Sequence, residues 1–235
     1  MDPTSQALAE LVNLRDLGGM PAGEGTTRSG IVLRSDAPRP GDREPDGITW
    51  PPRLVLDLRD AAELNGTAHP LAAVAEVHQI ELLAGIHSTE VTYSLPVLYQ
   101  LALQNAADKL VRVFRLALEA DGPVLVHCAA GKDRTGVVSA LLLSAAGVRS
   151  DAIIADYVRT DRNMFRVLQR LEMAPALPPG VSEEDVRELI STPVEAIEGV
   201  LESFAEHEQD AAGWLRSHGV TDEEIDRWRH KFRQD

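Results

Sequence analysis

One stretch constrains the fold of this chain more than any other. Residues 124–127 (Val-Leu-Val-His) form a short apolar run, residues 128–136 (Cys-Ala-Ala-Gly-Lys-Asp-Arg-Thr-Gly) follow, and residues 137–146 carry apolar side chains at helical spacing. A short apolar run is typical of a buried strand, and small residues with a glycine allow the chain to curl tightly. The stretch therefore predicts a strand, a tight loop and a helix.

The loop has the composition of an anion site. Successive N–H groups of a tightly curled backbone point into one concavity, which the positive end of the following helix closes. Arg134 can donate two parallel hydrogen bonds to a tetrahedral dianion. The same positive field favours the thiolate form of Cys128, the single cysteine of the chain. These features predict a cysteine nucleophile where phosphate is held.

The motif His-Cys-x5-Arg-Thr-Gly at residues 127–136 resembles the signature loop of the cysteine-dependent protein tyrosine phosphatases. Lysine and aspartate directly before the arginine are similar to the bacterial PtpB-like branch, whose members act on phosphotyrosine and in some cases on phosphoserine, phosphothreonine and phosphoinositides. A second match lies at residues 13–19 (Asn-Leu-Arg-Asp-Leu-Gly-Gly) and 33–35 (Leu-Arg-Ser). The resemblance extends over nearly the whole chain, but only in general pattern after residue 150.

On this interpretation Cys128 attacks phosphorus and forms a phosphocysteine intermediate that water then hydrolyses. Arg134 holds the dianion and then the equatorial oxygens of the transition state. The alternative for Cys128 is a buried, inert side chain, and the alternative for Arg134 is an ion pair on the surface. The loop positions expected to bind substrate are His127, Ala129, Ala130, Gly131, Lys132, Thr135 and Gly136.

The leaving group needs a proton, and the Trp-Pro-Asp triplet of the common phosphatase pattern is absent, since Trp50 is followed by two prolines. We expect Asp133 to be the general acid, by resemblance to the PtpB-like branch and by its reach from within the loop. Its alternative is a carboxylate that braces Arg134 or caps the helix. Asp57 and Asp36 are the reserve candidates.

Neighbouring loop side chains have expected roles too. The ammonium of Lys132 can bind a second phosphate of the substrate, and a similar lysine-bearing loop occurs in phosphoinositide phosphatases. Lys132 is therefore the candidate residue for substrate specificity. The alternative role is electrostatic support for the Cys128 thiolate. Thr135 is expected to donate a hydrogen bond to the Cys128 sulfur or to cap the helix. His127 is expected to orient the loop through hydrogen bonds to backbone.

The remaining charged side chains are expected to be mostly structural. Arg15, Asp16 and Arg34 should fix the N-terminal loop against the sheet, with contact to the phosphate loop as the alternative. Glu63 should form a solvated or bracing pair with Arg59. We expect no metal and no other cofactor, because six histidines show no metal-ligand spacing. These are at positions 69, 78, 87, 207, 218 and 230.

The formal charge of −14 disfavours nucleic acid and anionic membranes as partners, because both need clustered lysines and arginines. A phosphotyrosine-containing protein or a phosphoinositide is the expected substrate, and the oligomeric state is left open. Neither a membrane-spanning run nor a signal peptide is visible. We therefore expect no integral membrane association, and a location in the cytoplasm or outside the cell after export without a recognisable signal peptide.

Strands alternate with helices early in the chain and helices dominate late. The pattern predicts an α/β fold, a phosphatase-like central sheet flanked by helices, in one domain of residues 1–235. In PtpB-like relatives a pair of late helices forms a lid over the active site. Residues 181–207 are the candidate lid here, with residues 173–180 as its hinge. The alternative is that these helices form a fixed subdomain packed on the sheet. The expected strands are 31–34, 54–59, 74–83 and 124–127, with a turn or hairpin at 20–30. The expected helices are 6–12, a single turn at 60–64, 95–120 as one helix or two, 135–147, 150–160, 163–173, 182–190, 193–207, 209–218 and 221–233.

Other classes of protein also carry a cysteine-containing loop that binds an anion. Arsenate reductases and rhodanese-type sulfurtransferases also carry a cysteine loop, but such reductases need further cysteines and this chain has none. A non-catalytic phosphate-binding module would keep the loop for recognition alone. The intact Cys128, Asp133 and Arg134 argue against that module.

Overall fold

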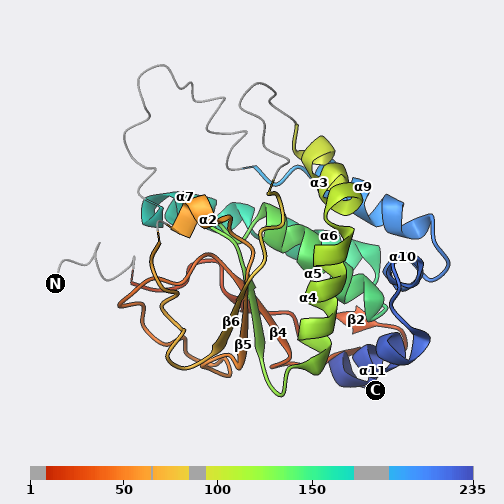
Figure 1. Cartoon of the computed structure of the whole chain (residues 1–235), viewed down its shortest axis with the longest axis horizontal. Helices are drawn as coiled ribbons and strands as arrows, with labels where there is room; N and C mark the ends of the chain where they lie inside the picture. Colours follow the sequence, from red (N-terminus) through yellow and green to blue (C-terminus); the bar gives the residue numbers. More distant parts are fainter. Residues whose placement is uncertain (1–8, 65, 85–93, 172–190, 235) are drawn as a thin grey trace.

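The computed structural model describes residues 9–64, 66–84, 94–171 and 191–234 (Figure 1). Its centre is a five-stranded sheet with the strand order β1-β4-β7-β5-β6. Strands β4 to β7 run parallel, and β1 adds an antiparallel edge. The strands are β1 (Arg15–Asp16), β4 (Val32–Ser35), β5 (Leu54–Asp57), β6 (Glu76–Gln79) and β7 (Val124–His127).

The two faces of this sheet are covered differently. Every residue of β4, β5 and β7 is buried, as expected for parallel strands covered on both sides. One face packs against helices in the main core. On the other face Leu33, Val55 and Leu125 pack beneath side chains that come mainly from loops, among them Ile48 and Trp50. The proline-rich segment 37–52 therefore serves as a cover for the sheet.

Most of the helices gather on the first face, around α5, whereas α2 and α7 lie apart from this group and the buried side chains of α7 pack in a separate cluster with Val12 (Figure 1). Helix α5 is buried from Thr135 to Ala145, because it contacts α4, α6, α9, α10 and α11 as well as the sheet. The helices are α2 (Ala61–Leu64), α3 (Leu95–Asn105), α4 (Ala107–Glu119), α5 (Asp133–Ala145), α6 (Ser150–Val158), α7 (Asp161–Arg170), α9 (Val194–Ala205), α10 (Ala211–Ser217) and α11 (Asp222–Phe232). No helix within the described ranges has both the length and the apolar character to cross a membrane.

A second, small sheet joins the two ends of the chain. It consists of β2 (Pro21–Ala22), β3 (Gly25–Thr27) and β8 (Arg233–Gln234), all antiparallel. The β2–β3 pair is the hairpin that the residues before β4 suggested. Pairing with β8 could not be predicted, since it joins segments about two hundred residues apart.

The expected fold class is confirmed. The strand expected at 74–83 shortens to β6, and the helical run at 95–120 is two helices that meet at Ala106. The helix expected at 6–12 is wrong over its described part. The Ala9 carbonyl accepts from the Arg43 N–H at 2.9 Å, and the Asn13 N–H donates to Asp36 Oδ1 at 2.8 Å, so both groups of the potential helical hydrogen bond are bonded elsewhere.

The segments expected to form a hinge and the first half of a lid, 173–180 and 182–190, lie outside the described residues. Helix α9 corresponds to the second half. Its side chains Ile197, Val200 and Phe204 are fully buried in the main core, and it packs chiefly against α3. For α9 this packing favours the fixed helical subdomain over a lid.

Candidate active site

The carboxyl ends of three parallel strands meet at one point. Ser35, His127 and Asp57 are paired in register at the ends of β4, β7 and β5. The loop that carries Cys128 begins there, and Cys128 is only 2% exposed. In open α/β sheets this edge, at the carboxyl ends of the strands, is where ligands bind.

The loop is held in place through its carbonyl groups, each of which, from His127 to Lys132, is hydrogen-bonded. The carbonyls of His127, Cys128 and Ala129 accept from Leu58 N at 2.9 Å, His127 Nδ1 at 3.1 Å and Ala37 N at 3.0 Å, respectively. Asn13 Nδ2 donates to the carbonyls of Ala130 and Gly131, each at 3.1 Å, and Arg34 Nη2 also donates to the Gly131 carbonyl, at 2.9 Å. The Lys132 carbonyl accepts from Gly136 N at 2.7 Å. The N–H groups of Ala129, Ala130 and Gly131 donate to no described residue. Three successive backbone donors of the loop therefore have no acceptor among the described residues.

Gly131 is the position in this loop that no other residue could fill. Its φ is +69°, in the left-handed region. A Cβ there would lie 2.3 Å from the carbonyl oxygen of Ser35. The turn and the close approach to β4 both require glycine, which explains its presence between Ala130 and Lys132.

The N-terminal motif supports the loop directly. Arg34 donates to Asp156 Oδ2 at 2.6 Å and to the Gly131 carbonyl, and Arg15 donates to Asp156 Oδ1 at 2.6 Å. Burial opposes the charge of Asp156, but the two arginines hold its pKa below the usual range. Burial, and then the nearby Arg34, lower the pKa of Arg15 to about 10. The motif thus fixes the N-terminal segment and also contacts the loop that begins at Cys128.

Arg134 reaches from the first turn of α5 to α2. Its guanidinium makes a bidentate pair with Glu63, with Nη2 at 2.9 Å from Oε1, and Nη1 also donates to the Leu58 carbonyl at 3.3 Å. Burial opposes its charge, yet the hydrogen bonds with Glu63 raise the pKa of Arg134. The expected pair of Glu63 with Arg59 is wrong, because Arg59 binds Asp57 at 2.6 Å.

Glu63 is therefore a functional candidate whose partner was predicted wrongly from the sequence. Its Oε2 also accepts the Asp60 N–H at 2.8 Å, the local contact that the Asp-x-x-Glu pattern predicts at a helix start. The pattern indicated that Glu63 begins a helix. It could not indicate that this helix lies beside Arg134.

Asp133 lies at the first position of α5, and its carboxylate is 31% exposed. Its Oδ1 accepts a 2.7 Å hydrogen bond from the Tyr99 hydroxyl, which lies 2.8 Å from the Tyr157 hydroxyl. Burial, Asp133 and Tyr157 raise the pKa of Tyr99 well above its usual value, so Tyr99 keeps its proton and donates it. Neither tyrosine was singled out from the sequence.

A small cavity adjoins this carboxylate. It holds about 170 Å³, and Asp133 and Arg134 form its polar end. The rest of the lining is almost entirely apolar: Leu82, Leu83, Leu95, Leu98, Tyr99, Ala102 and Val137. The cavity thus places an apolar surface directly beside the two charged side chains.

The other loop side chains are turned into the protein. Lys132 is buried, with Nζ donating to the Ser191 carbonyl at 2.9 Å and lying 3.5 Å from Asp133 Oδ1. The buried Thr135 hydroxyl makes no hydrogen bond with any described residue, so its expected bond to the Cys128 sulfur is not found. Gly136 allows α5 to approach α6, because a Cβ there would lie 3.0 Å from the Tyr157 ring.

Asp57 and Asp36, the other candidates for the general acid, are each paired with an arginine. Both oxygens of Asp57 accept hydrogen bonds from Arg59, which hold its pKa below the usual range although burial opposes this. Asp36 forms a 2.8 Å ion pair with Arg170. Burial raises the pKa of Asp36 despite this pair. Asp133, the first candidate, directly follows Lys132 of the loop, and its Oδ2 accepts no hydrogen bond from the described residues.

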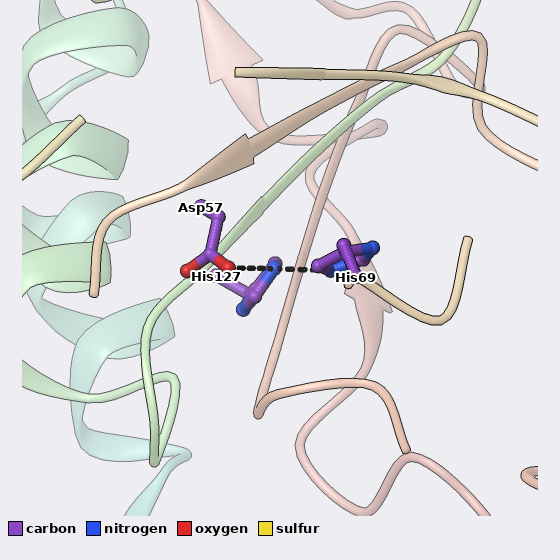
Figure 2. Close-up of side chains that lie close together, drawn as sticks. All are labelled: Asp57, His69 and His127. Atoms are coloured by element: carbon purple, nitrogen blue, oxygen red, sulfur yellow. Dashed lines mark hydrogen bonds and ion pairs between the residues drawn. The ribbon is translucent and has the colours of Figure 1, made fainter. Parts of the chain in front are cut away.

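Two histidines and an aspartate meet behind the loop (Figure 2). The Nε2 atoms of His69 and His127 are 3.0 Å apart, and His127 Nε2 lies 3.8 Å from Asp57 Oδ2. Burial lowers the pKa of His127 to about 4 and also lowers the pKa of His69, so both rings are neutral near pH 7. Side chains of these types can hold a metal, and their donor atoms lie within 4.8 Å of one another. Residue spacing could not reveal the group, because His69 lies in the loop between α2 and β6.

Comparison with known proteins agrees with this geometry. The chain matches the tyrosine phosphatase family over residues 6–234. It is 27% identical over 213 residues to the triple specificity protein phosphatase PtpB of Mycobacterium tuberculosis, covering 83% of this chain and 77% of the relative.

Two further relatives carry related names. A tyrosine-protein phosphatase of Nostoc commune is 45% identical over 65 residues, 27% of this chain and 22% of the relative. A putative tyrosine-protein phosphatase of Cupriavidus necator is 26% identical over 183 residues, 66% of this chain and 63% of the relative. With the family match extending over almost the entire sequence, the chain belongs to the tyrosine phosphatase family.

Proposed function

We propose that the chain hydrolyses phosphate monoesters, phosphotyrosine in proteins first among them, through a phosphocysteine on Cys128. The observation that carries the proposal is the loop, in which every carbonyl from His127 to Lys132 is hydrogen-bonded while the N–H groups of Ala129, Ala130 and Gly131 have no described acceptor. Donors arranged in advance around a dianion stabilise the charge that develops in phosphoryl transfer. Cys128 lies at the start of the same loop.

In the first step the Cys128 thiolate attacks phosphorus, the S–P bond forms, and the bond to the leaving oxygen breaks. Protonated Asp133 gives its proton to that oxygen. In the second step the Asp133 carboxylate takes a proton from water, whose oxygen attacks phosphorus and releases phosphate and the thiolate. Arg134 binds the equatorial oxygens in both steps, and Glu63 orients it through the bidentate pair.

Tyr99 supports the assignment of the acid. Its hydrogen bond to Oδ1 fixes the carboxyl of Asp133 and leaves Oδ2 for the reacting atoms. The apolar cavity beside Asp133 supports an aromatic stem as the group that carries the phosphate, since a phenyl ring has a small apolar surface to bury.

Phosphoinositide is the second candidate, because an ammonium lies next to the acid in the loop. Lys132 Nζ is held by the Ser191 carbonyl and lies near Asp133. A second phosphate on the substrate would compete with these oxygens for the ammonium. The relative named a triple specificity protein phosphatase supports action on more than one class of substrate.

The test is phosphate release from three substrates: a phosphotyrosine peptide, a phosphoserine peptide and a soluble short-chain phosphatidylinositol 3-phosphate. Each is run with wild type, Cys128→Ser and Lys132→Ala. Turnover of the phosphotyrosine peptide that Cys128→Ser abolishes and Lys132→Ala barely changes supports the proposal. Lipid turnover lost selectively in Lys132→Ala would assign a phosphoinositide enzyme, and no turnover with any substrate would leave a phosphate-binding module.

A further inference from the structure

The hydrogen bonds around His69 define which ring nitrogens carry hydrogen. The Leu71 N–H donates to His69 Nδ1 at 3.1 Å, so this nitrogen is the acceptor. Because the ring is neutral, its hydrogen is then on Nε2. The partner of that Nε2–H, at 3.0 Å, is His127 Nε2.

The same reasoning extends to His127. Its Nε2 accepts from His69, so the hydrogen of the neutral ring is on Nδ1. The partner of that Nδ1–H is the carbonyl of Cys128, at 3.1 Å. A directed chain therefore runs from Leu71 N–H through His69 and His127 to the Cys128 carbonyl, and every donor in it has one acceptor. Figure 2 shows His127 between the other two side chains.

This chain argues against a metal between the two rings. A metal would need unprotonated Nε2 atoms on both histidines, which would move the His69 hydrogen to Nδ1, facing the Leu71 N–H. Asp57 would also have to share its oxygens between the metal and Arg59, to which both are bonded. The three side chains fit a hydrogen-bonded support better than a metal site.

We propose that His69 is a positioning residue for the phosphate loop, acting through His127 to keep the Cys128 carbonyl turned away from the anion. The inference rests on the proposed role of Cys128 as the nucleophile. A carbonyl oxygen released into the loop would place its negative end near the thiolate and the phosphate, both of them anions. Holding it outward favours the thiolate and leaves the anion to the N–H donors of the loop.

The direct test reads the tautomers. Long-range proton–nitrogen NMR spectra of the uniformly ¹⁵N-labelled full chain distinguish Nδ1–H from Nε2–H histidines, with His69→Gln identifying the signals of His69. The result expected is Nε2–H for His69 and Nδ1–H for His127, unchanged on adding Zn²⁺. An Nε2–H tautomer at His127, or metal-type shifts of both rings with Zn²⁺, would overturn the proposal.

Two substitutions separate positioning from packing. In His69→Gln an amide N–H replaces the Nε2–H donor to His127, whereas in His69→Asn the amide reaches only the place of Nδ1. We expect His69→Asn to lower kcat/KM roughly five- to tenfold, the effect of losing one hydrogen bond, and to shift the pH midpoint of Cys128 alkylation upward. His69→Gln should stay within about threefold of wild type.

The control is His78→Gln, which removes a histidine paired with Glu76 on β6 and should leave both readouts unchanged. Equal losses in His69→Gln and His69→Asn, with no shift of the alkylation midpoint, would show a packing role only and refute the inference. Failure of the proposed function would appear separately, as activity retained in Cys128→Ser. If both variants unfold, the NMR measurement of the His69 and His127 tautomers in the wild-type chain still tests the proposal.

Discussion

The floor and the rim of the site are built in different ways. The floor is the loop from His127 to Lys132, where every carbonyl is hydrogen-bonded and Gly131 touches the backbone of β4. The rim comprises Asp133, its partner Tyr99 and the apolar cavity, and the Asp133 carboxylate is nearly one-third exposed. A rigid floor suits the displacement at phosphorus, which is common to all phosphomonoesters. An adjustable rim suits the choice of leaving group.

The largest effect is expected from breaking the floor itself. Gly131→Ala places a Cβ against the Ser35 carbonyl at a positive φ, so it should lower the free energy of unfolding by more than about 3 kcal/mol and abolish turnover. Gly147→Ala is the matched control, because its φ is +83° but its nearest neighbour lies at 3.9 Å. It should cost about 1 kcal/mol. Equal losses in chemical denaturation would mean that the close approach to β4 contributes nothing.

The second expected effect concerns the cation that bridges floor and rim. Arg134→Lys keeps the charge but loses the planar pair of donors, so kcat/KM should fall about 10²- to 10³-fold. Glu63→Gln keeps Arg134 and removes the charged partner, with an expected loss of roughly tenfold. Steady-state kinetics on a phosphotyrosine peptide measure both. A larger loss in Glu63→Gln than in Arg134→Lys would contradict a role for Glu63 that acts only through Arg134.

At the rim, the effect should depend on the leaving group. Asp133→Asn removes the proposed acid, so kcat/KM, which reports the first step and not the hydrolysis of the intermediate, should fall about 10²-fold with a phenyl phosphate that needs protonation. The loss should be several-fold smaller with a nitrophenyl ester, whose oxygen leaves without a proton. Tyr99→Phe keeps the carboxyl and should show the same trend at smaller size. Identical losses with both esters would remove Asp133 from the acid role.

The floor should also respond to acid. The pKa of His127 is about 4 in the folded chain against 6.5 for an exposed histidine. Between these values the unfolded chain binds more protons, so the free energy of unfolding should decrease as the pH falls from about 6.5 to 4, by about 3 kcal/mol in all. Chemical denaturation across this range measures the slope. His127→Gln should flatten it, and an unchanged slope would show that another group is responsible.

The smallest effect is expected from the Lys132 side chain, at the end of the floor that adjoins Asp133. Lys132→Ala removes an ammonium that is already bonded to the Ser191 carbonyl, so turnover of a phosphotyrosine peptide should change less than about threefold. Lipid turnover should fall more, if lipid is a substrate. A tenfold loss with the peptide would show that the Lys132 ammonium takes part in the turnover of phosphotyrosine.

The floor was far more predictable from the sequence than the rim. Residues 124–136 carry the strand, loop and helix start in one continuous pattern, and glycine at position 131 indicates the turn. The carbonyl anchors Asn13, Ala37 and Arg34 come from segments about a hundred residues away, and only the N-terminal motif pointed to two of them.

Partners brought together by tertiary packing escaped prediction for a physical reason. Glu63 has a complete local explanation as a helix-start residue, so its pairing with Arg134 left no signal. Tyr99 lies in an apolar helix, where an aromatic side chain is typical of the core. His69 lies in a loop without periodicity, and it acquires a partner only when β5 and β7 align.

Trapping the phosphoryl group on Cys128 between the two steps tests the proposed mechanism most directly. Asp133→Asn, which should slow hydrolysis of the intermediate, is mixed with nitrophenyl phosphate, whose oxygen leaves without a proton, so that formation of the intermediate is slowed less than its hydrolysis. The mixture is denatured within milliseconds to seconds and digested for mass spectrometry. We expect one phosphoryl group on the peptide that contains Cys128, and none in Cys128→Ser. Turnover of substrate with no such adduct at any time point, and with activity retained in Cys128→Ser, would contradict a phosphocysteine mechanism.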